Sequence, residues 1–184
     1  MKKTNVHLLF CACLVLGMAV SCNKKSTEPD VITGGNGTPG DGFSETSAAG
    51  VTFKWKINGN NLDCQVSAQT AGWVAVGFNA SASMSGADFI IGYVTGTSAV
   101  TLRDEHGTGH SHTIDAVPHI LNGSTGTESG GITTITFSIP LNSGDLQDFV
   151  LAKGASVTVL FAYGATDNPA TQHVAFGTKQ VTLN

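Results

Sequence analysis

The chain has 184 residues, carries a formal net charge of −4 at pH 7, and has charged residues at only 12% of its positions. Its few lysines and arginines form no basic stripe, which argues against nucleic acid as a partner, because phosphate backbones are bound by clustered positive charge. Glycine is frequent, at 23 residues, and this is typical of a fold with many turns.

The first 21 residues have the pattern of a secretory signal peptide. Two lysines precede an apolar run over residues 6–20, which is shorter than the roughly 20 residues that a membrane-spanning helix needs. The run ends in Ala-Val-Ser-Cys, which resembles a bacterial lipobox in which Ala19 replaces the usual leucine. We therefore expect residues 1–21 to be removed and Cys22 to carry lipid, so that the protein is anchored to a bacterial membrane outside the cytoplasm. Cleavage near this point without lipid attachment is the alternative.

Residues 22–49 differ from the rest of the chain in composition. Glycine, proline, serine, threonine and charged residues dominate, and almost no large apolar side chain is available for burial. Such a segment cannot offset the entropy that it would lose on ordering. We therefore expect a flexible tether between the lipid anchor and the folded domain.

Residues 50–184 are numerous enough for one domain with a hydrophobic core. Short apolar or alternating segments recur there with turn residues between them, which indicates an antiparallel β-sandwich or barrel. In residues 51–57 the alternation is regular and places Val51, Phe53 and Trp55 on one face. The predicted strands cover residues 51–57, 62–68, 72–78, 89–94, 99–104, 132–139, 155–164 and 173–183.

No motif of a known catalytic site is present in the sequence. Cys64 is the only cysteine of the expected domain, so we predict a small buried hydrophobe rather than a disulfide. The sequence has no CxxCH for covalent haem attachment and no CxxC pair for a zinc ribbon. It also lacks a nucleophile elbow, a phosphate loop and an HExxH motif. We therefore predict no catalytic residue and expect the domain itself not to be an enzyme.

The aspartates of the expected domain have structural interpretations. Asp88 opens a predicted strand, where it either accepts hydrogen bonds from amides of the preceding loop or is a plain strand-start residue. Asp145 and Asp148 follow Pro140 and are expected in a turn or short capping segment on a solvated surface.

Met84 is the one methionine after the predicted signal peptide. It lies in a loop of alanine, serine and glycine between the predicted strands 72–78 and 89–94, where no core needs a long thioether. Such a side chain either fills a gap or acts as a soft metal ligand.

His173 is a candidate partner of Met84, because it stands at the start of the last predicted strand and the loops of a β-sandwich gather at its ends. A thioether and an imidazole together form an axial ligand pair for haem iron. Taken alone, the two residues also fit one core methionine and one surface histidine. Several aromatic side chains offer apolar surface for a flat macrocycle, namely Trp73, Phe78, Phe89, Tyr93, Phe161, Tyr163 and Phe176.

A second group of potential ligands lies in the segment RDEHGTGHSHTIDAVPH, residues 103–119. Its members His106, His110 and His112 form a possible second metal site for Zn²⁺, Cu²⁺ or Ni²⁺, since imidazole suits all three ions. Asp104, Glu105 and His119 belong to the same segment. The alternative is a polar hairpin loop with adventitious metal affinity.

The order of several segments resembles the DOMON domain family. The segments are GWVAVGFN at 72–79, MSGADFIIGYV at 84–94, GGITTITFSIPLNSGDLQDFVLAKGASVTVLFAYG at 130–164 and HVAFGTKQVTL at 173–183. The resemblance extends over nearly the whole expected domain and implies an immunoglobulin-like β-sandwich that binds either haem b or sugars at one end.

The resemblance also implies which residues hold the ligand. In haem-binding members, such as the cytochrome domain of cellobiose dehydrogenase, a methionine in the loop after the Gly-Trp strand and a histidine before the last strand hold the iron. Met84 and His173 occupy these places. The loop from His106 to His112 is not a recognisable family feature.

The expected function is therefore one-electron transfer between non-covalent haem b and an unidentified redox partner protein, because an iron with two protein ligands has no open position for substrate. The alternative is a carbohydrate-binding module of a surface lipoprotein, in which Trp73, Tyr93 and Tyr163 stack on a sugar ring.

Overall fold

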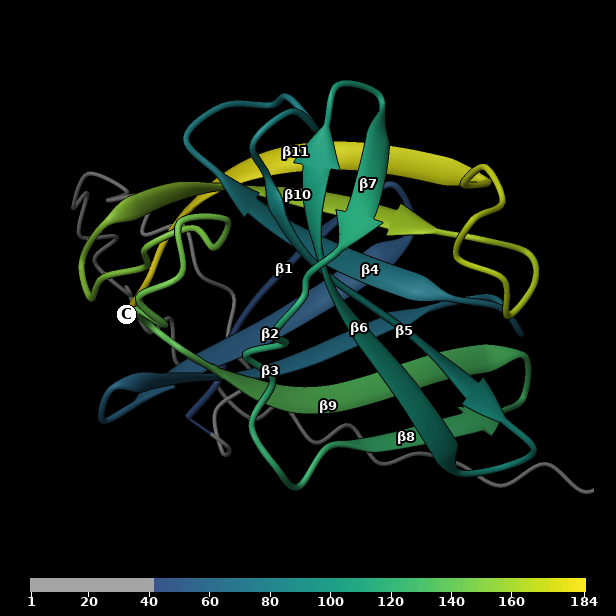
Figure 1. The fold of residues 1–184 in the computed structure, drawn as a ribbon. Coiled ribbons are helices and arrows are strands. Elements are labelled where there is room, and N and C mark those ends of the chain that lie inside the picture. The colour runs from purple at the N-terminus through teal and green to yellow at the C-terminus, as the bar shows by residue number, and fades with distance from the viewer. Residues whose placement is uncertain (1–41) are drawn as a thin grey trace, which may run out of the picture. The chain divides into compact units, whose positions relative to one another are not determined.

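The structure, a computed structural model, describes residues 42–184 (Figure 1). The predicted signal peptide, the lipidation of Cys22 and the tether up to residue 41 lie outside the described residues. Between residues 42 and 184 no helix has the length and apolar character needed to span a membrane.

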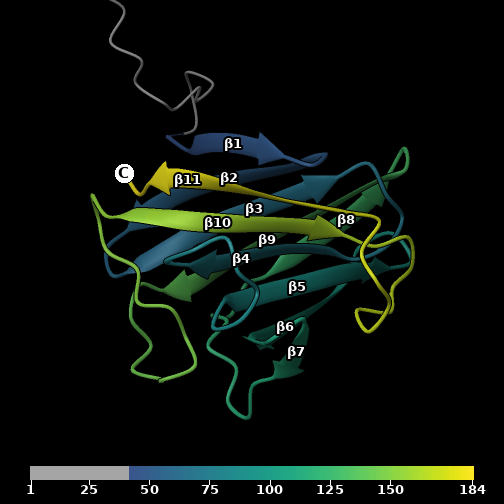
Figure 2. The ribbon, with the colours of Figure 1, turned by 90° about the horizontal axis from the view of Figure 1, so that it is seen from above.

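The described residues form two antiparallel sheets packed face to face, which confirms the predicted all-β, immunoglobulin-like sandwich (Figure 2). From edge to edge, the five-stranded sheet consists of β1 (Ser44–Ala48), β2 (Val51–Asn58), β3 (Asn61–Ala68), β9 (Ile132–Pro140) and β8 (Thr125–Ser129). The six-stranded sheet consists of β11 (Ala175–Thr182), β10 (Ser156–Tyr163), β4 (Val74–Asn79), β5 (Asp88–Thr95), β6 (Ala99–Thr108) and β7 (Ser111–Ile114).

The core lies between the two sheets and follows the alternation of the sequence. Val51, Phe53 and Trp55 of β2 are buried there, as predicted. Cys64 of β3 is a free, fully buried thiol in the same core, which also confirms its prediction. In β9 the inward positions begin at Thr133, so the neighbouring Ile132 is left 43% exposed.

Strand β1 lies in a segment that the sequence analysis assigns to the tether. It pairs with β2 along its length through a two-residue turn, Ala49-Gly50, in which both residues have positive φ (51° and 81°). Turns with two left-handed residues match the twist of a hairpin. Composition could not reveal this strand, because its polar residues belong to a sheet edge. Strands β7 and β8 are polar and were also not predicted.

Strand β4 is buried on both faces, although the domain has only two layers. Val74, Val76 and Phe78 point into the core between the sheets. Ala75 points to the outer face of the six-stranded sheet, where the usual outward residues of a sandwich are polar. There it belongs to a second apolar cluster with Trp73, Ala87, Phe89, Ile91 and Leu160. This apolar outer face defines where a ligand can bind.

Candidate functional site

A pocket of about 800 Å³ opens on the outer face of the six-stranded sheet. This volume is within the roughly 300–1,000 Å³ range of small-molecule and cofactor sites. Its floor consists of residues that are neighbours across four strands, so strand register alone brings them together. One such row runs through Ile91, Ala75, Ala162 and Phe176. The next row contains Phe89, Leu160 and Thr178, and the ring of Phe89 covers its fourth residue, Gly77.

Three segments that are far apart in the sequence form the rim of the pocket. They are residues 82–85 before β5, residues 109–112 in the β6–β7 hairpin, and residues 170–173 before β11. Met84 belongs to the first segment and His173 to the third, so both line the same pocket. A ligand was expected at one end of the sandwich. The pocket lies against a sheet face instead, because the hairpin and both loops rise beside that face.

The backbone around Met84 is attached to strand β6. The Gly86 nitrogen donates to the Gly107 carbonyl at 2.9 Å, and the Gly107 nitrogen donates to the Ala87 carbonyl at 2.8 Å. The Ala87 nitrogen also donates to the Met84 carbonyl at 3.0 Å. A Cβ atom at Gly107 would overlap that carbonyl, so glycine is required for this close approach. The thioether therefore extends from a loop with a defined position.

Asn79 holds the same loop from the other side. Its side-chain amide donates to the carbonyls of Ser83 at 2.7 Å and Ser85 at 3.2 Å, on either side of Met84. The Ala80 nitrogen donates to the Asn79 Oδ1 atom at 2.7 Å. This role of Asn79 was not predicted from the sequence, although an asparagine directly after an apolar strand is a typical turn signal.

His173 lies in the third rim segment, residues 170–173, and is half-buried. Its ring lies against Phe176, with 4.9 Å between the ring centroids and an interplanar angle of 51°. The next residue, Val174, donates its backbone N–H to the Tyr163 carbonyl at 2.8 Å and so fixes the backbone at the entry to β11.

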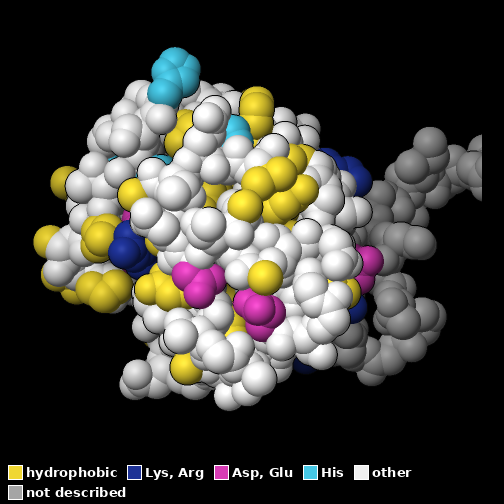
Figure 3. All heavy atoms as spheres, turned by 90° about the vertical axis from the view of Figure 1, so that its right-hand side faces the viewer, with side chains coloured by type: hydrophobic (Ala, Val, Ile, Leu, Met, Phe, Trp, Pro, Cys, Tyr) yellow, Lys and Arg dark blue, Asp and Glu magenta, His cyan; other side chains and the backbone are white. Residues whose placement is uncertain are grey.

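Apolar side chains are exposed beside His173. Val174 is 58% exposed and Phe176 is 69% exposed, although Phe176 lines the pocket. Figure 3 shows groups of hydrophobic side chains exposed on one face of the domain. A large aromatic ring at the edge of an apolar pocket suits a ligand with a broad apolar surface.

A third potential ligand, His112, also lines the pocket. Its Nδ1 atom pairs with the Glu105 carboxylate, which is only 1% exposed beneath the hairpin. The other carboxylate oxygen of Glu105 lies 3.5 Å from the Arg103 Nη1 atom. This pairing leaves the Nε2 atom of His112 without an assigned partner. The sequence could not show it, because the pairing depends on the register of the hairpin.

The structure does not bring the three histidines of the predicted second metal site together. The Nδ1 atom of His106 pairs with Asp115, and its Nε2 atom lies 3.1 Å from the Gln147 Nε2 atom. His112 pairs with Glu105 instead. His110 stands in the turn of the hairpin, at the rim of the pocket. Within residues 42–184, these three histidines are not part of any cluster of convergent metal-ligating atoms. The alternative interpretation, a polar hairpin, describes this segment.

The predicted aromatic residues divide between the two faces of the sheet. Trp73, Phe89 and Phe176 line the pocket. Phe161 borders it as well, but its side chain belongs to the inner core, because Phe161 pairs with the inward-facing Val76. Phe78 does not line the pocket, because its side chain points inward from β4. It packs edge-on against Phe53, with 6.0 Å between the ring centroids. Tyr163 lies against the same inner core, and Tyr93 packs on the outer cluster without lining the pocket. Phe78, Tyr93 and Tyr163, which were expected to contact the ligand, therefore do not line this pocket.

Trp73 is held deep in the site. Its side chain is 4% exposed, and a Cβ atom at Gly164 would overlap its indole ring. The Trp73 nitrogen donates to the Thr166 carbonyl at 3.0 Å, and the Gly164 nitrogen donates to the Trp73 carbonyl at 2.8 Å. The Gly-Trp and Ala-Tyr-Gly segments noted in the sequence are therefore adjacent parts of one packing arrangement.

The class of protein is thus a two-sheet β-sandwich with an apolar pocket on one outer face, lined by a thioether and by imidazoles. The sequence profile of the DOMON domain matches residues 47–164, and the chain belongs to this family.

Two solved structures share the fold. The cytochrome b domain of pyranose dehydrogenase from Coprinopsis cinerea is 15% identical, with 76% of this chain and 81% of that chain covered and a TM-score of 0.60. The cytochrome domain of Myriococcum thermophilum cellobiose dehydrogenase is 13% identical, with 77% and 83% covered and a TM-score of 0.60. At these identities, the likeness concerns the fold.

Proposed function

We propose that this domain binds one non-covalent haem b between Met84 and His173 and exchanges single electrons with a partner protein. The observation that carries the proposal is that these two side chains, which are 89 positions apart, line one apolar pocket. The two solved neighbours are cytochrome domains, which agrees with it.

The residues of the pocket suit a haem group. Trp73, Phe89 and Leu160 supply apolar surface. The small side chains of Ala75 and Ala162 leave space for a ligand above the centre of the floor. A thioether with an imidazole is an established axial pair, and the thioether raises the reduction potential of the iron. When bound, the haem would supply one-electron chemistry.

The chain's own residues position the ligands. Asn79 and Gly107 hold the loop that carries Met84, and the contact with Phe176 orients the ring of His173. With both axial positions filled by protein atoms, no coordination position remains for a substrate. This arrangement favours electron transfer over catalysis by the domain itself.

We further propose that Cys22 carries lipid and that the protein is tethered to a bacterial membrane on the extracytoplasmic side. The lipobox-like end of the apolar segment supports this, and the polar residues after it supply the tether. A flexible tether would let the domain reach redox partners at the membrane and beyond it.

The test is the absorption spectrum of the full chain reconstituted with haem. We expect sharp α and β bands in the reduced state, which Met84→Ala and His173→Ala each abolish. His112→Gln serves as the matched control. It removes an imidazole of the pocket rim that pairs with Glu105, and the bands should persist. Loss of the bands in His112→Gln with retention in His173→Ala would overturn the ligand assignment, and no haem binding would reject the function.

A carbohydrate-binding role has less support from the site. Trp73, Tyr93 and Tyr163 were expected to stack on a sugar ring, but only Trp73 lines the pocket and Tyr163 packs against the inner core. Calorimetry with soluble oligosaccharides separates the two functions: heat of binding to a sugar in haem-free protein would favour this second role.

A further inference from the structure

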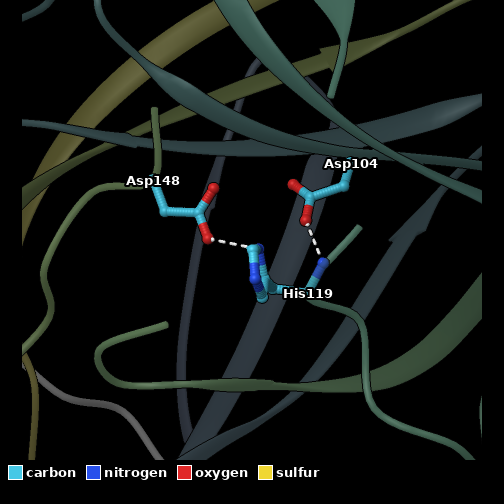
Figure 4. A group of neighbouring side chains, drawn as sticks. All are labelled: Asp104, His119 and Asp148. Atoms are coloured by element: carbon cyan, nitrogen blue, oxygen red, sulfur yellow. Dashed lines mark hydrogen bonds and ion pairs between the residues drawn. The ribbon is translucent and has the colours of Figure 1, made fainter. Parts of the chain in front are cut away.

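A second site, which is polar, lies on the inner face of the six-stranded sheet, away from the apolar pocket. It contains Asp104 of β6, His119 of the segment after β7, and Asp148 of the segment before β10 (Figure 4). One potential ligand atom from each residue lies within 4.8 Å of the others. The group is partly to fully buried, so it is not an ordinary surface cluster of acidic residues.

Asp88 stands beside this group and lines the same cavity of about 10 Å³. Its side chain is 5% exposed, and that of Asp104 is 2% exposed. Each has one carboxylate oxygen that accepts a backbone N–H: Asp88 from Phe149 at 3.1 Å, and Asp104 from His119 at 2.6 Å. The second oxygen of each is buried and accepts no hydrogen bond. The same holds for one oxygen of Asp148.

Buried polar atoms without partners are costly, and native proteins satisfy nearly all of them. Here three carboxylate oxygens, from three residues, are left unsatisfied around one small cavity. No lysine or arginine is among the residues that line this cavity. The site therefore has an excess of negative charge that a cation would neutralise.

We propose that Asp104, His119 and Asp148 bind a divalent cation of the Zn²⁺ type, with the carboxyl group of Asp88 beside it. The imidazole favours Zn²⁺ over Ca²⁺, which prefers an all-oxygen shell of six to eight ligands. The Nδ1 atom of His119 already lies 3.0 Å from an Asp148 oxygen. Tetrahedral bonds of about 2.0–2.2 Å place ligand atoms about 3.3–3.6 Å apart, so only small side-chain movements are needed.

The proposed site is structural rather than catalytic. It joins two segments with little regular structure, 115–124 and 141–155, to strands β5 and β6 of the sheet. It lies behind the haem pocket, because neighbouring residues of β5 and β6 face opposite sides of the sheet. Its residues are not ligands of the proposed haem, so the two proposals can fail separately.

The test is calorimetric titration of the haem-free, chelator-treated full chain with ZnCl₂, and separately with CaCl₂. We expect one Zn²⁺ per chain, bound more tightly than Ca²⁺, together with a rise in melting temperature. Asp104→Asn and His119→Gln should each weaken Zn²⁺ binding by at least about 100-fold, since loss of only an outer-shell partner costs 10–100-fold. Circular dichroism checks that both variants fold.

Asp145→Asn is the matched control, because Asp145 lies in the same segment as Asp148 but accepts only the Gln147 N–H, which asparagine can also accept. It should bind Zn²⁺ like the original protein. Met84→Ala should also leave Zn²⁺ binding unchanged. Absence of Zn²⁺ binding, or equal affinity in Asp104→Asn and the original protein, would overturn the proposal, the second outcome pointing to adventitious binding by surface histidines.

Discussion

Asp88 and Phe89 are consecutive residues of β5 that serve opposite faces of the same sheet. Phe89 lines the apolar pocket, whereas Asp88 lies in the polar site on the inner face, where it accepts the Phe149 N–H. Alternation along a strand therefore separates the two sites by the thickness of one sheet. Both residues directly follow the loop that carries Met84. Contacts on both faces of the sheet therefore help to position this loop.

Asn79→Ala is expected to weaken haem binding without changing the axial ligands. The substitution removes the side-chain amide that donates to Ser83 and Ser85, and a hydrogen bond of this kind is worth about 1 kcal/mol. We expect haem affinity to fall about tenfold, which corresponds to about 1.4 kcal/mol, while the reduced spectrum keeps its shape. Transfer of haem to excess apomyoglobin measures the dissociation rate.

Asn142→Ala is the control for this prediction. Asn142 also accepts a backbone N–H in a loop, from Gly144 at 3.0 Å, but it lies away from the pocket lining. Equal dissociation rates for Asn79→Ala and Asn142→Ala would mean that the amide of Asn79 does not hold the loop of Met84.

Gly107→Ala is expected to displace the Met84 loop. The added Cβ atom would meet the Met84 carbonyl, which is backbone and cannot rotate away. Overpacking of this kind typically costs about 1–3 kcal/mol. We expect a lower midpoint of urea unfolding and weaker α and β bands in the haem-loaded protein. Thr108→Ala, at the exposed neighbouring position, should change neither quantity, and a Gly107→Ala variant with unchanged stability would contradict the close approach.

Local patterns predicted much of the fold, because the alternation of apolar residues depends only on neighbours in the chain. The inward faces of β2 and β4 follow directly from it, and the same rule could have separated Phe78 from the pocket, since Val74, Val76 and Phe78 are two positions apart. The polar strand β1 escaped prediction, because a sheet edge needs few apolar residues.

Long-range pairing explains what the sequence could not show. Asp148 is expected on a solvated surface when only its neighbours are considered, but the fold brings its segment against Asp104, which is 44 positions earlier. Asp88 was expected either to accept amides of its own loop or to be a plain strand-start residue, and it accepts the distant Phe149 N–H instead. Met84 and His173 were singled out from the sequence, yet only the register of β4, β10 and β11 builds the shared pocket floor.

The stability of the metal-free domain is expected to fall as pH rises. Burial, with the charges of Asp104, Asp148 and Asp115, raises the pKa of Asp88 from 3.8 to about 8. The folded state therefore binds this proton more tightly than the unfolded state. The resulting stabilisation is complete below about pH 4 and is lost as the pH approaches 8.

Asp88→Asn removes this titration but can still accept the Phe149 N–H. In the presence of a chelator, its melting temperature should exceed that of the original protein by several degrees at pH 8, and the difference should vanish near pH 4. One pKa unit corresponds to about 1.4 kcal/mol, so even part of the shift is measurable. Asp145→Asn should follow the original protein at every pH, and a constant difference for Asp88→Asn across the range would show that Asp88 does not titrate as described.

The two faces of the sheet can be separated with one pair of substitutions, Phe78→Leu and Phe89→Leu. Phe78 is fully buried between the sheets and packs on Phe53, so its truncation should lower the free energy of unfolding by roughly 1–2 kcal/mol, less than the 3–5 kcal/mol typical of Phe→Ala. Because its ring does not line the pocket, haem affinity should stay within about twofold. Phe89→Leu changes the pocket wall instead, so haem affinity should fall by more than about fivefold with a smaller loss of stability. Urea unfolding of the haem-free protein and haem titration measure the two effects, and a Phe78→Leu variant that loses haem while keeping its stability would contradict this division between the faces.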